Sequence, residues 1–159
     1  QFSDNRFIHM PDVFNLMGYD IADVSGSSGQ TQYIVIRNNL IEDLDGTNYG
    51  GGYGSFVLFT TGPRNFTVSH NTVINAAAGN EVVIGSNGQG SRGVTQNALI
   101  VNNLMRYENY GFFADSNQGD AAISYIMPDG FFRYNVMSDE LGTVAGTPFT
   151  APRGLDAVK

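Results

Sequence analysis

Short apolar runs alternate with glycine, asparagine and serine along the whole chain. The runs are three to five residues long, rich in Val, Ile and Phe, and bounded by turn-forming residues. This pattern is typical of β-strands that are joined by tight turns. Helix is disfavoured, because the 159 residues include 20 glycines and 16 asparagines, which are weak helix formers. The pattern predicts an all-β protein.

One asparagine recurs at a nearly constant spacing of 34 and then three times 32 residues. Its five copies are Asn5, Asn39, Asn71, Asn103 and Asn135. Three residues before each copy stands a large apolar residue: Phe2, Ile36, Val68, Ile100 and Phe132. Two residues after each copy stands another: Phe7, Ile41, Val73, Met105 and Met137. The alternation predicts two short strands that meet at a corner, with these apolar side chains buried.

A further strand is expected after each corner, and polar connections of differing length lead to the next copy. These strands are Phe14–Met17, Ser55–Phe59, Glu81–Ile84 and Gly111–Ala114. Variable loops on a fixed period predict a solenoid. We expect a right-handed parallel β-helix of about five turns, stacked about 4.8 Å apart. Residues 1–140 would form the turns and residues 141–159 a C-terminal extension or cap.

The five asparagines are expected to form an inward ladder. Each would bond to local backbone and to the asparagine of the next turn. We also expect them to take the left-handed backbone conformation that a sharp corner requires.

The pattern I-x-N-N-x-I, present at residues 36–41 and in similar form at 100–105, resembles the parallel β-helix repeat of the pectate-lyase-like superfamily. Residues 103–136 and the later LDAV at 155–158 are similar to large secreted β-helix proteins of soil bacteria. The superfamily resemblance implies association with polysaccharide, as lyases, hydrolases, epimerases or adhesins. The same scaffold also serves structural roles.

Charge and composition narrow the choice of partners. The net charge is −7, and the only lysine is Lys159, so nucleic-acid binding is not expected. The chain has no cysteine and no apolar window long enough to span a membrane. Cysteine-free chains rich in Asn, Gly, Thr and Ser are common among exported bacterial proteins, so we expect an extracellular or cell-surface location.

Because the chain starts at Gln1 and its first asparagine motif leaves no room for a cap, we expect a segment of a longer protein. The alternative is an open end that pairs with another chain into a fibre.

A calcium site is one candidate. Pectate lyases of the superfamily bind Ca²⁺ through acidic clusters, and Glu42, Asp43 and Asp45 lie together after the second asparagine. Oxygen-rich loops of this kind can hold Ca²⁺. The alternative is a solvated acidic loop, since the segment lacks alternating D-x-D-x-D-G spacing.

Catalytic candidates follow from the superfamily's hydrolases and lyases. Hydrolases use converging aspartates, and lyases use a basic residue to abstract a proton. The candidates are Asp20, Asp115, Asp120, Asp129 and Arg133. Aligning the second strands places Gly18, Thr60, Gly85 and Asp115 in one column and Asp20 in another. Asp20 and Asp115 would then be three turns apart, about 14 Å, which is too far for a carboxylate pair.

Sugar-binding candidates are outward arginines and loop tyrosines. Arg37, Arg106 and Arg133 could contact uronate carboxylates, although surface arginines are common without such a role. The tyrosines are Tyr49, Tyr53, Tyr107, Tyr110 and Tyr125. Exposed tyrosines suit sugar stacking, while others could cover the core.

His70 is interpreted as a local variant at a corner, not as a catalytic residue. Its slot holds Asp4, Asn38, Asn102 and Tyr134 in the other copies, and no serine has a nucleophile motif. Two functions therefore stay open. One is a β-helix that binds or processes polysaccharide, and the other is a structural or adhesive module that assembles end to end.

Overall fold

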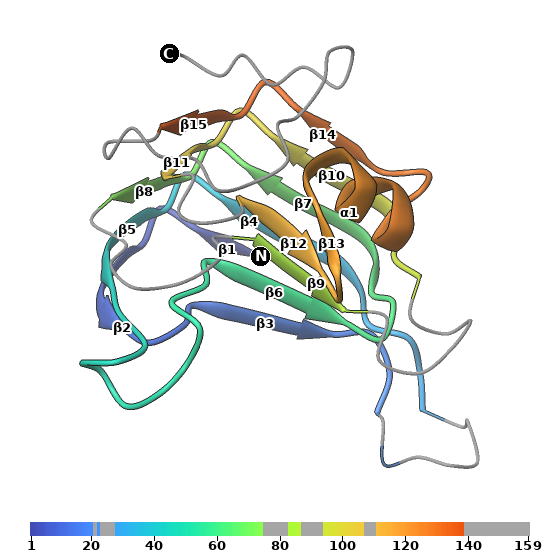
Figure 1. Cartoon of the computed structure of the whole chain (residues 1–159), viewed down its shortest axis with the longest axis horizontal. Helices are drawn as coiled ribbons and strands as arrows, with labels where there is room; N and C mark the ends of the chain where they lie inside the picture. The colour runs from blue at the N-terminus through green and yellow to red at the C-terminus, as the bar shows by residue number, and fades with distance from the viewer. Residues whose placement is uncertain (21, 23–27, 75–82, 87–93, 107–110, 139–159) are drawn as a thin grey trace.

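The chain folds as a solenoid of three parallel sheets. The structure is a computed structural model that describes residues 1–20, 22, 28–74, 83–86, 94–106 and 111–138. Each turn of the chain contributes one strand to each sheet, so strands far apart in sequence stack side by side (Figure 1). The predicted all-β parallel β-helix is confirmed, with one short helix added. The extension at 141–159 lies outside the described residues.

Sheets A and B flank the asparagine corner. Sheet A consists of β1 (Phe2–Ser3), β4 (Gln32–Arg37), β7 (Arg64–Ser69), β10 (Gln96–Val101) and β14 (Phe131–Arg133). Sheet B consists of β2 (Arg6–Met10), β5 (Leu40–Leu44), β8 (Thr72–Ile74), β11 (Leu104–Arg106) and β15 (Val136–Ser138). All neighbours in both sheets are parallel.

Sheet C closes the coil. It consists of β3 (Phe14–Met17), β6 (Val57–Thr60), β9 (Val83–Ser86), β12 (Phe112–Ala114) and β13 (Asn117–Gln118), and only β13 runs antiparallel to its neighbour. Within the described residues, the predicted second strands are correct to within two residues at their ends; the predicted start of Glu81–Ile84, at residues 81 and 82, lies outside the described residues. Three turns, β4–β6, β7–β9 and β10–β12, have neighbours on both sides. The predicted count of about five included the outer turns β1–β3 and β14–β15.

The apolar columns pair as the repeat predicts. Ile36, Val68, Ile100 and Phe132 are in register across sheet A and are each at most 1% exposed. Phe2 belongs to the same column but is 48% exposed, because β1 is the outermost strand of its sheet. Burial of these columns along the axis supplies the main stabilisation of the coil.

The asparagine ladder is continuous through all five copies. In the first four copies, the backbone N–H and the Nδ2 of the asparagine both donate to the Oδ1 of the next asparagine, at 2.9–3.1 Å. From Asn39 onward, each Nδ2 also donates to a carbonyl of the preceding turn; Asn71, for example, bonds to Ile36 O at 3.1 Å. The last four copies are at most 2% exposed, so the ladder satisfies polar groups inside the corner.

The left-handed corner residue is the one before the ladder asparagine. φ lies between 52° and 62° at Asp4, Asn38, His70, Asn102 and Tyr134, and the ladder asparagines have no positive φ. The prediction that the ladder asparagines take the left-handed conformation is therefore wrong. Hydrogen bonding fixes the asparagine, whereas the exposed residue before it makes the turn and varies in type.

Helix α1 (Gly119–Ile126) was not predicted. Its eight residues fall where the sequence favoured a polar connection, and two helical turns are too short to show a clear period. Ala122, Ile123 and Ile126 are fully buried, and α1 packs on β9, β12 and β13. A Cβ at Gly85 would lie 2.9 Å from Ile126 and 3.0 Å from Phe59, so the missing side chain leaves room for the helix.

Candidate functional site

The loop between β5 and β6, residues 45–55, is held at both ends by aspartates; we call it the tyrosine loop. At its start, Asp45 Oδ1 accepts from the backbone N–H groups of Thr47 (2.8 Å) and Asn48 (2.9 Å). Asp45 is 6% exposed, and its Oδ2 also accepts from Asn48 Nδ2 at 2.6 Å. Asp45 therefore folds the first turn of the loop.

Asp12, just after β2, holds the other end of the tyrosine loop. Its Oδ1 accepts from the Ser55 N–H (2.8 Å), the Ser55 hydroxyl (2.6 Å) and the Tyr53 N–H (3.2 Å). Close packing adds to these bonds, since a Cβ at Gly46 would lie 2.2 Å from the Gly52 carbonyl oxygen. The loop is thus fixed in shape while the Tyr53 residue stays 61% exposed.

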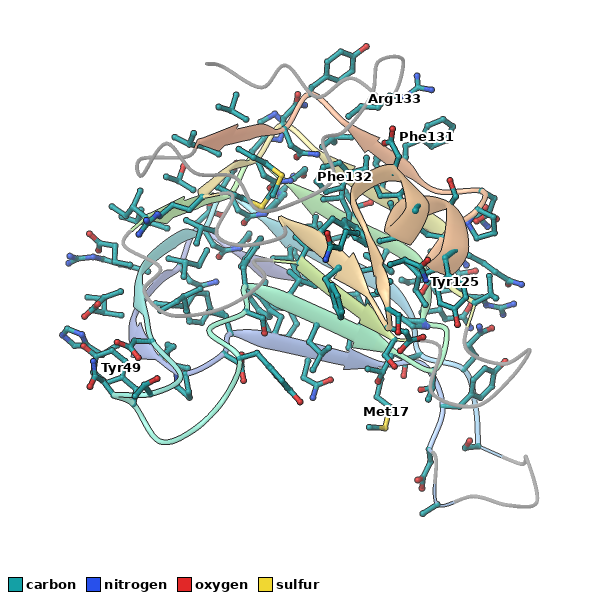
Figure 2. All side chains as sticks on the ribbon, in the orientation of Figure 1. Met17, Tyr49, Tyr125, Phe131, Phe132 and Arg133 are labelled. Atoms are coloured by element: carbon teal, nitrogen blue, oxygen red, sulfur yellow. The ribbon has the colours of Figure 1, made fainter. Side chains whose placement is uncertain are left out.

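His9, Asp43 and Tyr49 form a hydrogen-bonded cluster beside this loop. The backbone is in the left-handed conformation at both His9 (φ 57°) and Asp43 (φ 61°). The two residues lie opposite each other on β2 and β5, between the paired positions Ile8–Glu42 and Met10–Leu44. His9 Nδ1 lies 2.6 Å from Asp43 Oδ2, and the Tyr49 hydroxyl donates to the same oxygen at 2.6 Å. The His9 and Tyr49 rings are 5.1 Å apart between centroids. Tyr49 follows β5 in the chain, and its ring contacts His9 on β2, the strand of the preceding turn. Figure 2 shows Tyr49 beside β2.

The cluster shifts the titration of its members in opposite directions. The Tyr49 hydrogen bond, with a further contribution from His9, lowers the pKa of Asp43. The Asp43 carboxylate raises the pKa of Tyr49, since ionised tyrosine would be repelled and could not donate. At neutral pH the cluster therefore holds an ionised Asp43 and a neutral Tyr49.

We expect Asp43→Asn to return the Tyr49 pKa toward its ordinary value of about 10. In the wild type, the raised pKa of Tyr49 means that its protonated hydroxyl stabilises the folded state. This stabilisation is fully present below the ordinary pKa of tyrosine and is lost as the pH rises through the pKa of Tyr49 in the folded state. The lowered pKa of Asp43 acts oppositely: its contribution is present above about pH 4 and is lost as pH falls. Ultraviolet titration of tyrosinate, with Tyr49→Phe to identify the band, measures the shift. An identical alkaline titration in wild type and Asp43→Asn would contradict the hydrogen bond.

The three carboxylates of the calcium hypothesis do not converge. Glu42 is bonded to the Arg6 guanidinium, Asp43 to His9 and Tyr49, and Asp45 to its own loop. In the described ranges, no group of three or more His, Cys, Asp or Glu side chains has the geometry to hold a metal ion. The donor set therefore does not fit Ca²⁺.

The aspartate candidates also lie apart. Asp20 accepts from the Ala22 N–H in the first turn of the coil. Asp115, directly after β12, accepts from the hydroxyl of Ser86 at the end of β9, and Asp120 lies in the first turn of α1. The strand register aligns Asp115 with Ser86, Thr60 and Met17. The predicted column had Gly85 and Gly18 in place of Ser86 and Met17, so it is wrong by one residue at these two positions. Asp20 follows Met17, so three strand steps separate it from Asp115, in agreement with the sequence argument. Asp129 Oδ1 accepts from the Asn97 N–H.

The arginine candidates lie on other surfaces. Arg37 and Arg133 share an outward column of sheet A, again three strand steps apart. The Arg133 guanidinium lies over the Phe131 ring at 4.8 Å, and Figure 2 shows both beside β14, away from Tyr49. Arg106 ends β11 and is half-buried. Tyr107 and Tyr110 lie outside the described residues, and Tyr125 is exposed on α1.

The sequence patterns suggested Tyr49 and Tyr53 as sugar-binding candidates, a prediction that stays open, but they did not single out His9. The signal was present, because His9 stands four residues after Asn5 and Asp43 four residues after Asn39. Extending the repeat alignment by that offset stacks the two side chains. Tyr49 could not be paired with them in this way, since the connections that follow the corner differ in length and sequence from copy to copy.

Comparison with known proteins adds no family. No protein-family model, no curated protein and no solved structure matches the chain. The β-helix arrangement is therefore established by the structure, and the superfamily resemblance remains an interpretation of the repeat. Among the described residues, no helix is long and apolar enough to span a membrane.

Proposed function

We propose that this chain is a carbohydrate-binding β-helix module that works outside the cell or on its surface. The observation that carries the proposal is the tyrosine loop, which presents the exposed Tyr53 on a backbone fixed by Asp12 and Asp45. A rigid aromatic ring is a suitable platform for the apolar face of a sugar, and it loses little conformational entropy on binding.

Polar groups for sugar hydroxyls lie in the same region. Asp43 is ionised and has acceptor capacity beyond the two bonds to Oδ2, and the His9 side chain is 62% exposed. The combination of an aromatic platform with fixed acceptors and donors matches what a hydroxyl-rich ligand needs. The net charge of −7 favours a neutral glycan over a polyuronate.

Tyr53→Ala is expected to weaken glycan binding about twofold to thirteenfold, which corresponds to the 0.5–1.5 kcal/mol of an aromatic contact. Calorimetric titration with soluble neutral polysaccharides measures the affinity. Tyr33→Asn is the matched control: Tyr33 is 75% exposed on sheet A, and asparagine tolerates its φ of 60°. Equal weakening by both changes would place the site elsewhere.

A structural or adhesive module is the second candidate. The observation that favours it is the outer turn, where Phe2 is 48% exposed and the ladder residue Asn5 is exposed at the same edge. A parallel edge of this kind can pair with a further strand, either from the same protein or from another chain. Absence of glycan binding together with concentration-dependent sedimentation would favour this candidate.

A further inference from the structure

The His9–Asp43–Tyr49 cluster has a fixed proton arrangement. An ionised carboxylate only accepts hydrogen bonds, so His9 Nδ1 must carry the hydrogen that bonds to Asp43 Oδ2. In the neutral imidazole Nε2 then has a free lone pair. Among the described residues no hydrogen bond to Nε2 occurs, and the side chain is 62% exposed. This is the arrangement of a general base that is oriented by a carboxylate.

The backbone and Tyr49 hold this arrangement in place. His9 and Asp43 both occupy left-handed conformations, at equivalent points of the adjacent strands β2 and β5. Tyr49 bonds to the same Asp43 oxygen from the tyrosine loop. Asp43 is therefore fixed from two sides, and it in turn orients the imidazole ring.

The surrounding groups exclude two of the reactions known for polysaccharides. Glycoside hydrolysis needs a protonated carboxyl group as acid, but Asp43 is held ionised and Glu42 is paired with Arg6. Elimination from a uronate needs positive charge to neutralise the uronate carboxylate. Among the described residues, Glu42 and Asp45 add negative charge beside the cluster, and the Arg6 guanidinium is already bonded to Glu42. Ester hydrolysis needs only one base and a water molecule.

We propose that this cluster hydrolyses acyl esters on the hydroxyl groups of a neutral polysaccharide, with His9 as general base and Asp43 as positioning residue. The proposal rests on the carbohydrate-binding function proposed above, because the tyrosine loop would hold the acylated sugar beside His9. The substrate class is an O-acylated, uncharged glycan.

The reaction balances without a further reactant. His9 Nε2 takes a proton from water while the water oxygen bonds to the acyl carbon, and the carbonyl electron pair moves to its oxygen. The tetrahedral intermediate collapses, the bond between the acyl carbon and the sugar oxygen breaks, and that oxygen takes the proton back from Nε2. One water is consumed, and a carboxylic acid and a free sugar hydroxyl are released. No atom is oxidised or reduced.

The test measures acyl release and binding on the same protein. The probes are O-acetylated xylan, deacetylated xylan for binding alone, and p-nitrophenyl acetate, which carries the ester without a sugar. His9→Asn is expected to lower kcat/KM about 100-fold, the usual share of a general base. Asparagine tolerates the left-handed backbone at this position, so the fold should be kept. The chain has only one other histidine, His70, which is also left-handed, and His70→Asn should leave the rate within about twofold.

Asp43→Asn tests the positioning role. We expect a fall in kcat that is larger than any change in KM. The ¹⁵N NMR signals of the His9 ring should also show loss of the tautomer with hydrogen on Nδ1, which a purely structural role would not alter. An unchanged tautomer would overturn the role of Asp43.

The outcomes separate the two proposals. Binding of deacetylated xylan without release of acetate from either ester overturns the esterase inference and leaves the binding function standing. Absence of both binding and release overturns both. Release that His9→Asn and His70→Asn reduce equally also overturns the inference.

Discussion

Asn71→Ala is expected to lower the free energy of unfolding by about 3 kcal/mol. The change removes the Oδ1 that accepts from the Asn39 N–H and Nδ2, and the Nδ2 that donates to Ile36 O, Ser69 O and Asn103 Oδ1. Asn39 and Asn71 are at most 2% exposed, so water cannot replace these bonds. Leaving a buried polar group unpaired costs about 1–3 kcal/mol, and several are affected here. Urea denaturation followed by circular dichroism gives the value.

Asn5→Ala is the control within the same ladder. Asn5 is exposed, and its Nδ2 donates only at the edge of the coil, to Ser3 O and Asn39 Oδ1. Water can satisfy the groups that it leaves, so we expect a loss below about 1 kcal/mol. Equal losses at positions 5 and 71 would mean that burial of the ladder does not decide its contribution.

Gly18→Ala is expected to destabilise the protein by about 3 kcal/mol, at the upper end for overpacking. A Cβ at this position would lie 2.2 Å from Thr61 O, 2.3 Å from the Gly62 carbonyl carbon and 2.4 Å from Pro63 N. All three atoms belong to the backbone of the next turn, so no side-chain rotation relieves the clash. Gly18 is also fixed by the bond from its N–H to Thr60 O at 2.8 Å.

Gly29→Ala is the matched control for Gly18. A Cβ at Gly29 would meet nothing within 4 Å, and its φ is not left-handed. Alanine there should be neutral or stabilising by up to about 1 kcal/mol, through the unfolded chain. Denaturation midpoints that coincide for the two variants would show that the first turn does not pack against residues 61–63 as described.

The period of the sequence was sufficient to predict the columns of the coil. A fixed spacing of 32 residues forces equivalent positions to stack, which is why Ile36, Val68 and Ile100 pair as expected. The left-handed corner was assigned one residue too late, to the asparagine itself. The constant asparagine was interpreted as the residue with the unusual backbone. Asparagine is required there because of its hydrogen bonds, whereas the residue with the positive φ varies in type, from Asp4 to Tyr134.

The candidate site depended on features that a repeat does not encode. The stacking of His9 on Asp43 follows from an equal offset after the ladder asparagine and could be predicted. The position of Tyr49 depends on Asp45 and Asp12, which shape one loop in one turn. The acidic residues Glu42, Asp43 and Asp45 suggested a metal site, but their partners are Arg6, His9 with Tyr49, and the loop itself. Composition alone could not distinguish carboxylates that shape a loop from carboxylates that converge on an ion.

The central claim is that carbohydrate binds at the tyrosine loop beside His9. Titration of the ¹⁵N-labelled protein with deacetylated xylan oligosaccharides, followed by amide and imidazole NMR signals, tests this claim most directly. We predict saturable shifts at His9, Asp43, Tyr49 and Tyr53, with sheet A residues such as Arg37 and Phe131 unmoved. Shifts confined to sheet A, with the His9 and Tyr53 signals unchanged at saturation, would contradict the account.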